Sequence, residues 1–295
     1  MDNQIQTMKE AGKIRLLFAD MVWLTLFLSV WGALIAFWDT WRAIPLVPLF
    51  SVMLLGFSEM MHQGAHGNLC GRVKSLNHAL GRVAGAVVGI DMNAYREFHL
   101  AHHRLVNTPD DSERPIYADP RNVAIGVSWK NRSAFGCFAG FLLSLGSYMR
   151  GMLTAFNPND WLVWLMRLGV PAIIGSIGYL RGLRETIPLL LLVAWYLPFA
   201  LYFVPDFFLA QSEHYGTMDK PTAERIDNNE QYEISWNLKL LPPLSFMVFS
   251  RNLHAEHHGT PGIHWWYARD KMTGRTFPAF AYLRQWWANG PRVMT

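Results

Sequence analysis

The sequence predicts an all-α membrane protein with four transmembrane helices, interfacial helices and a cytosolic cap rich in histidine. Of its 295 residues, 51% are hydrophobic and only 16% are charged. The 13 Trp, 10 Tyr and 18 Phe residues are typical of a chain that meets a bilayer interface. Because no Pro/Gly/Ser-rich linker or low-complexity tract divides the chain, we interpret residues 1–295 as one integral membrane domain.

Four apolar segments are long enough to cross a hydrocarbon core. They are residues 21–38, residues 43–58 with their continuation to His62, residues 161–180 and residues 186–205. The first of these carries no charge between Asp20 and Asp39. The second would place His62 and His66 at the end of the membrane span.

Three other apolar stretches are not expected to cross. Residues 83–90 are too short. Residues 133–149 are rich in Gly and Ser and flanked by basic residues, so we interpret them as an interfacial helix. A crossing there would place the histidines before and after it on opposite faces of the membrane. Residues 236–250 are predicted to form an apolar helix docked on the membrane or on the bundle.

Four crossings return both termini and all the histidine clusters to one side. That side then holds 23 of the 26 basic residues, because only Arg42, Arg181 and Arg184 lie on the other, and the positive-inside rule identifies it as the cytosol. The first twenty residues lack a small-residue cleavage site, so they are not expected to be a removed signal peptide.

The net charge of +4 and the pI near 9.1 do not indicate a nucleic-acid-binding protein, because the basic residues are scattered among apolar segments. Membrane lipid headgroups are the expected counterpart. The two cysteines, Cys70 and Cys137, are too few for a cysteine-based zinc or iron–sulfur site.

Eight of the eleven histidines fall in three short boxes, and helical spacing turns the side chains of each box to one side. The boxes are His62 and His66; His99, His102 and His103; and His254, His257 and His258. A lone histidine is more often structural, but eight packed imidazoles cannot all be protonated or all be left without partners. A shared metal resolves both problems, and eight ligands are too many for one ion. Two metals are predicted.

The order HxxxH, HxxHH, HxxHH resembles the membrane-bound fatty acid desaturase/hydroxylase superfamily. The runs HGNL, HHRLVNTPDD and NLHAEHHGTPGIHWWY, and the pair Leu76 and Asn77, resemble bacterial desaturase-like sequences, and the similarity covers roughly residues 50–270. In that family a further histidine between the second and third boxes often completes the ligand set, and here His214 fills that place. The resemblance implies two iron ions (Fe2+/Fe3+), O2 as co-substrate, and nine ligands: His62, His66, His99, His102, His103, His214, His254, His257 and His258.

Residues beside the boxes are candidates for support. Glu97, Glu213 and Glu256 are candidates to accept the second ring N–H of a ligand, with ordinary solvated glutamates as the alternative. Asn77 and Asn252 are candidates to hold a metal-bound water, although helix capping or packing explains them equally well. We interpret His78 and His264 as structural, and His264 stands where the family often has proline.

The resemblance favours an O2-dependent di-iron desaturase that introduces a C=C bond into an acyl or other largely apolar substrate. Breaking an unactivated C–H bond requires a redox-active metal, and zinc is redox-silent. The alternative within the family is a hydroxylase or ketolase, for instance one that acts on carotenoids. A metal-binding or transport membrane protein is less favoured, because transporters place ionisable residues near the midplane of their spans and these histidines lie at span ends.

The sequence contains no HPGG-type haem motif, no four-cysteine cluster and no Gly-rich dinucleotide fingerprint. We therefore expect electrons from a separate donor, such as a ferredoxin with its reductase, that docks on the basic cytosolic face. The expected location is a bacterial inner membrane. Lipids, acyl-thioesters and other small molecules all remain open as substrates.

Overall fold

The apolar segments of the sequence form long helices in a computed structural model of the chain. The structure describes residues 18–70, 73–113, 133–155, 160–215, 222–269 and 272–289. Four of the described helical segments are long and apolar enough to cross a membrane: Ala19–Ala36, Ala43–His66, Trp161–Leu180 and Arg184–Glu213. The predicted all-α membrane class with four spans is therefore confirmed. The fourth span is longer than predicted and continues to Glu213.

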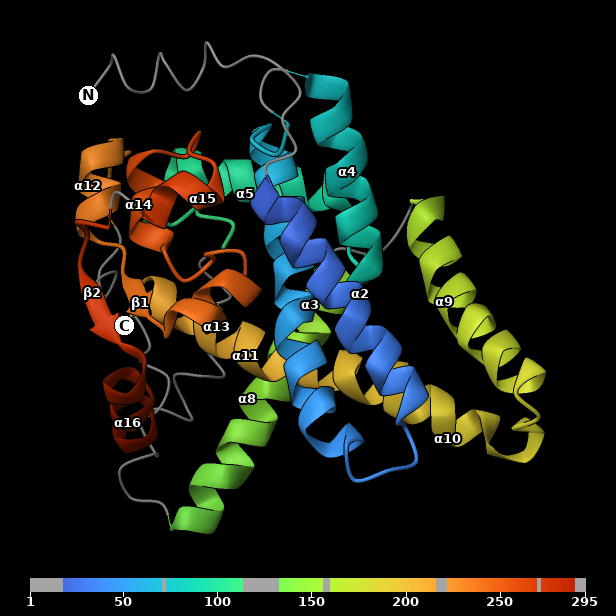
Figure 1. Cartoon of the computed structure of the whole chain (residues 1–295). Coiled ribbons are helices and arrows are strands. Elements are labelled where there is room, and N and C mark those ends of the chain that lie inside the picture. The colour runs from blue at the N-terminus through green and yellow to red at the C-terminus, as the bar shows by residue number, and fades with distance from the viewer. Residues whose placement is uncertain are drawn as a thin grey trace. The chain divides into compact units, whose positions relative to one another are not determined.

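The described chain divides into two compact units, shown together in Figure 1. The first comprises Met1–Asn93, Asn157–Pro205 and Phe246–Phe249, and the second comprises Ala94–Phe156, Asp206–Ser245 and Ser250–Thr295.

The first unit contains helices α2 (Phe18–Ala36), α3 (Ala43–His66), α4 (Lys74–Val87), α9 (Trp161–Leu180) and α10 (Ile187–Leu191), the 3₁₀ turn η1 (Arg184–Thr186) and the π-helical turn η2 (Leu192–Tyr196). Trp23 of α2 anchors its core: the ring is fully buried, packs edge-on against Phe57 of α3 and donates a hydrogen bond to the carbonyl of Met247 at 2.9 Å. This packing fixes α2 against α3.

Helix α3 packs closely on α4 (Figure 1). Two glycines lie at this contact. A Cβ atom added at Gly64 would lie only 2.7 Å from the Cα atom of Gly81, so the contact requires glycine. The helix then ends at Gly67, which adopts φ 77°, and the N–H of Asn68 bonds back to the carbonyl of Gln63 at 2.8 Å. The histidines of box one therefore lie in the last two turns of a helix whose end is closed by these hydrogen bonds.

Helix α4 is joined to α9 by a partly buried ion pair. Arg82 donates two hydrogen bonds of 2.7 Å to Asp160, whose side chain also caps α9 at the N–H of Leu162. The arginine and the two hydrogen bonds hold the pKa of Asp160 below its ordinary value. A charged carboxylate thus holds the start of the third span against α4.

The second unit contains most of α5 (Met92–Leu105), helix α8 (Ala134–Ala155), the end of α11 (Leu197–Glu213), and the short helices α12 (Asn228–Glu233), α14 (His254–Gly259), α15 (Trp265–Ala268) and α16 (Ala279–Asn289). Helix α13 (Pro242–Met247) begins in this unit and ends in the other. Helix α8 contains the stretch expected to be interfacial, and it is not among the four candidate spans. Its place at the membrane surface stays a prediction.

The prediction of one helix over residues 236–250 is wrong. Residues Asn237–Lys239 form strand β1, which pairs in parallel with β2 (Thr276–Pro278), and only Pro242–Met247 is helical. The N–H of Leu238 donates to the carbonyl of Asn252 at 2.7 Å. The backbone here therefore bonds to residues distant in sequence and not to residues of its own helical turn. Pro242 and Pro243 cannot donate to a helix that would begin before them.

The prediction that the first twenty residues are not a removed signal peptide concerns a segment that lies, apart from residues 18–20, outside the described residues.

Candidate metal centre

Box two lies in the last turns of α5, where helical spacing places its three imidazoles on one side. His99 and His102 are buried, with 2% and 0% of their surfaces exposed. Box three forms most of α14, a helix of six residues in which all three histidines are buried. His214 follows the last residue of α11 and is also buried. Seven of the nine predicted ligands thus belong to the second unit.

Four of these seven form one cluster: His102, His214, His254 and His258. Each offers one ligand atom, and these atoms all lie within 4.8 Å of one another. The Nε2 atoms of His254 and His214 are 3.2 Å apart, and those of His102 and His258 are 3.3 Å apart. Four converging imidazole nitrogens are the number that a tetrahedral ion binds, and six-coordinate iron would leave positions open.

The hydrogen bonds around the cluster fix which ring nitrogen carries a proton. The Nδ1 of His102 donates to Asp111 at 2.8 Å, and the Nδ1 of His258 donates to the amide oxygen of Gln231 at 3.0 Å. In the neutral rings both Nε2 atoms therefore carry lone pairs, and these face each other. Two lone pairs at this distance repel unless a proton or a cation lies between them. The arrangement fits a bound metal.

Burial strengthens this conclusion. Burial, together with the positive charge of a protonated His102, lowers the pKa of His214 to about 3. Burial and the surrounding imidazoles also keep the pKa of His258 well below its ordinary value. Burial opposes protonation of His102 as well, but the carboxylates of Glu113 and Asp111 raise its pKa overall. His214 and His258 are thus neutral at pH 7 and ready to bind a metal.

The other three histidines of the second unit form a second group. The Nε2 of His103 lies 3.0 Å from the Nε2 of His99 and 2.8 Å from the Nε2 of His257. The Nδ1 of His99 donates to Glu113 at 2.5 Å, which leaves its Nε2 directed at the group. This group repeats the pattern of a carboxylate that orients an imidazole.

Box one lies in the first unit, at the end of α3. The rings of His62 and His66 are 5.0 Å apart, and the Nδ1 of His62 lies 2.8 Å from Glu59. Gln63 donates to the other oxygen of the same carboxylate at 2.7 Å. His62 is therefore oriented by a residue one helical turn earlier.

The supporting residues expected from the sequence have other contacts. Glu97 is exposed on α5 and has no described contact with a histidine. Glu256 accepts hydrogen bonds from the side chain of Asn237 and from the backbone of Thr273 and Gly274, so it organises the loop before β2. Glu213 comes nearest to the expected role, with an oxygen 3.8 Å from the Nδ1 of His254.

The two asparagines are bound to the surrounding chain. Asn252 accepts from the hydroxyl of Ser245 and donates to the carbonyl of Leu238, both at 2.8 Å. Asn77, in the first unit, accepts from the N–H of Cys70 at 2.7 Å and donates to the carbonyl of Val73 at 3.1 Å. These contacts support the packing interpretation of both side chains.

Sequence reasoning missed several residues that contact the histidines, among them Glu59, Asp111, Glu113 and Gln231. Two of them could have been predicted from the sequence, because Asp111 and Glu113 are acidic residues that closely follow box two. Gln231 had no local signal, because 27 residues separate it from His258.

His264, interpreted as structural, caps α15. Its Nδ1 accepts a hydrogen bond from the N–H of Trp266 at 3.2 Å. Burial lowers the pKa of His264 to about 4, which keeps the ring neutral and able to accept. The side chain therefore has a local role where a proline would have fixed the backbone.

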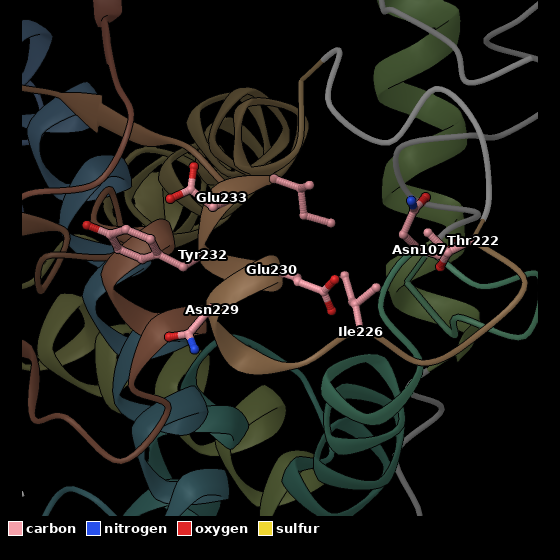
Figure 2. Close-up of a pocket in the computed structure, with 8 residues that line it drawn as sticks. Asn107, Thr222, Ile226, Asn229, Glu230, Tyr232 and Glu233 are labelled. Carbon is pink, nitrogen blue, oxygen red and sulfur yellow. The ribbon is translucent and has the colours of Figure 1, made fainter.

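Helix α12 separates the histidines from a pocket of about 630 Å³. Gln231 is buried on the side that faces His258, whereas Asn229, Glu230 and Glu233 line the pocket on the other side. Figure 2 shows Glu230 directed toward Ile226, with Asn107 and Thr222 across the opening. None of the nine predicted ligands lines this pocket.

Comparison with known proteins agrees with this geometry. The model of the family described as fatty acid desaturase matches residues 39–287, which include every histidine described above. A comparison with curated proteins gave no match. Since the matched region covers most of the 295 residues, the chain belongs to the fatty acid desaturase family.

Proposed function

We propose that the protein is an O2-dependent, non-haem di-iron desaturase that introduces a C=C bond into an acyl or other largely apolar substrate. The observation that carries the proposal is the cluster of His102, His214, His254 and His258, whose lone pairs converge in a buried, fixed arrangement. Family membership supplies the reaction class.

We propose that the cluster holds one iron and that His99, His103 and His257 hold the second together with His62 and His66. The assignment of box one to the second iron rests on the order and spacing of the boxes in the sequence. When bound, the two irons would supply the activation of O2 and the removal of hydrogen from an unactivated C–H bond.

The protein's own residues prepare this chemistry. Asp111, Glu113 and Gln231 keep the protons of their histidines on Nδ1, so that the Nε2 atoms stay available to metal. The same carboxylates add negative charge beside the cations and reduce the cost of burying them. Burial of the imidazoles excludes water from the site.

Desaturation and hydroxylation share the first hydrogen removal and differ in the second step, which either removes another hydrogen or inserts oxygen. The choice depends on how the pocket positions the substrate. Lipids and small molecules should be compared by mass spectrometry between cells that make the parent protein and cells that make His257→Ala, both grown under labelled dioxygen. A parent-dependent product that is unlabelled and lighter by two hydrogens supports desaturation. A principal product that carries the label would show that the protein is a hydroxylase or ketolase.

We further propose that a separate electron donor, such as a ferredoxin with its reductase, docks on the cytosolic face, and that both termini lie on that face. The sequence supports a separate donor, because it contains no haem, iron–sulfur or dinucleotide motif. Purified protein loaded with iron should turn over only when a donor and reductase are added. Steady turnover with NAD(P)H alone would refute a separate donor.

A further inference from the structure

Asp206 is a charged residue in an otherwise apolar stretch of α11, FVPDFFLA, and none of its surface is exposed. A buried carboxylate in a candidate membrane span is costly unless it has partners, and it commonly marks a functional site. Its described partners are two side chains of the same unit. The hydroxyl of Tyr148, on α8, donates to one oxygen at 2.6 Å, and Arg251 donates to the other.

Arg251 connects this carboxylate to box three. It lies three residues before His254, and its Nε is 3.6 Å from an oxygen of Glu213. The same oxygen of Glu213 lies 3.8 Å from the Nδ1 of His254. One guanidinium thus bridges two carboxylates, and the second of these faces a predicted metal ligand.

Glu213 faces one particular nitrogen of His254. Its oxygen lies 3.8 Å from Nδ1, which is too long for a direct hydrogen bond but places an acceptor on that side of the ring. An acceptor beside Nδ1 favours the tautomer of His254 with its proton on that nitrogen. The Nε2 of His254, which lies 3.2 Å from the Nε2 of His214, then keeps its lone pair for metal.

We propose that Asp206 and Arg251 are positioning residues for the metal cluster of the second unit. Asp206 fixes the guanidinium of Arg251, Arg251 fixes Glu213, and Glu213 sets the orientation and tautomer of His254. This inference rests on the proposed function only in so far as the four-histidine cluster binds a metal.

The rival explanation is that the group only ties α8 and α11 to box three. In that case its loss would lower the melting temperature and leave the metal site of the folded molecules unchanged. A measurement of the bound metal distinguishes the two explanations.

Co2+ is a suitable probe, because its absorption bands report ligand geometry, and it requires neither substrate nor O2. Metal-free full-length parent protein in nanodiscs would be titrated with Co2+ against a competing chelator, and the melting temperature recorded for each variant. The variants are Arg251→Met, Arg251→Lys, Asp206→Asn and Glu213→Gln. Tyr148→Phe is the matched control, because it removes one hydrogen bond at the end of the group farthest from His254.

We expect Arg251→Met, Asp206→Asn and Glu213→Gln to weaken Co2+ binding at one of two sites by tenfold or more and to shift its absorption bands. Arg251→Lys should recover part of the affinity, and Tyr148→Phe should bind like the parent. Asp206→Asn and Glu213→Gln conserve shape, so they carry the test if Arg251→Met does not fold.

Folded variants with parental affinity and bands, changed only in melting temperature, would overturn the positioning role. A parent that binds no Co2+ at all would overturn the proposed metal centre itself. The two failures are therefore distinguishable.

Discussion

Gln231 accepts a hydrogen bond from the Nδ1 of His258 at 3.0 Å, and its amide nitrogen donates to the backbone carbonyl of His103 at 3.0 Å. One side chain of α12 thus contacts residues of both box two and box three. Because an amide oxygen can only accept, this contact determines which nitrogen of His258 is left for metal.

Replacing Gln231 with Leu should weaken metal binding without removing any ligand. Loss of a hydrogen-bond partner of a metal-binding histidine typically lowers metal affinity by about 10–100-fold. The measurement is a Co2+ titration against a chelator. Asn229→Leu is the matched control, since Asn229 is exposed on the same helix and lines the pocket on its outer side. Equal affinity of the Gln231 variant and the control would contradict the prediction.

Box one should be dispensable for one metal and necessary for the other. All four histidines of the cluster belong to the second unit, so the double variant His62→Ala, His66→Ala should keep about one iron per chain, where the parent binds about two. His254→Ala should instead damage the four-histidine site. Elemental analysis of protein made in iron-rich medium checks both. A double variant that retains as much iron as the parent would remove box one from the ligand set.

Gly64→Ala should destabilise the protein. The new Cβ atom would lie 2.7 Å from the Cα atom of Gly81, and overpacking of this kind costs about 1–3 kcal/mol. The helix carrying His62 and His66 would also have to shift. Gly169→Ala, within α9, is the control, because its Cβ would meet nothing within 4 Å. The control should be neutral or more stable by about 0.5–1 kcal/mol. Melting temperatures in detergent compare the two, and a Gly64 variant as stable as the control would contradict the predicted clash.

His264 should make stability depend on pH. Its folded pKa of about 4 is below the unfolded value of about 6.5. Between these values the unfolded chain binds more protons, so the free energy of unfolding falls as the pH is lowered through 6.5 toward 4. His264→Asn retains a capping oxygen and does not titrate, so this variant should lose less stability than the parent between pH 7 and 4.5, by about 2 kcal/mol. Identical pH profiles in thermal unfolding would argue against this account.

The sequence predicts the part of this protein that depends on local spacing. Uncharged runs located the spans, and helical periodicity placed His99, His102 and His103 on one side of a helix before any contact was known. The predicted metal ligands could be recognised because the histidines of each box are close together in sequence.

The rest depends on contacts between distant residues. Gln231 lies 27 residues from His258, and no local pattern distinguishes it from other polar residues of α12. Residues 236–250 are apolar enough for a helix, but the pairing of Asn237 with Thr276 decides their structure. Glu256 lies inside box three, yet the strand and loop that surround it turn its carboxylate to Asn237 and the N–H groups of Thr273 and Gly274.

The π-helical turn at Leu192–Tyr196 makes the fourth span sensitive to its exact number of residues. A π turn holds one residue more than an α turn, so deleting a single residue there could restore a regular helix. Each residue of an α-helix advances the direction of the side chains by about 100°, so such a deletion would rotate the side chains of α11 relative to those of α10 by about that angle. The hydropathy of the span would hardly change, whereas Asp206 and Glu213 would point in new directions. In aligned relatives, a one-residue gap at this position would therefore mark a change in helix phase.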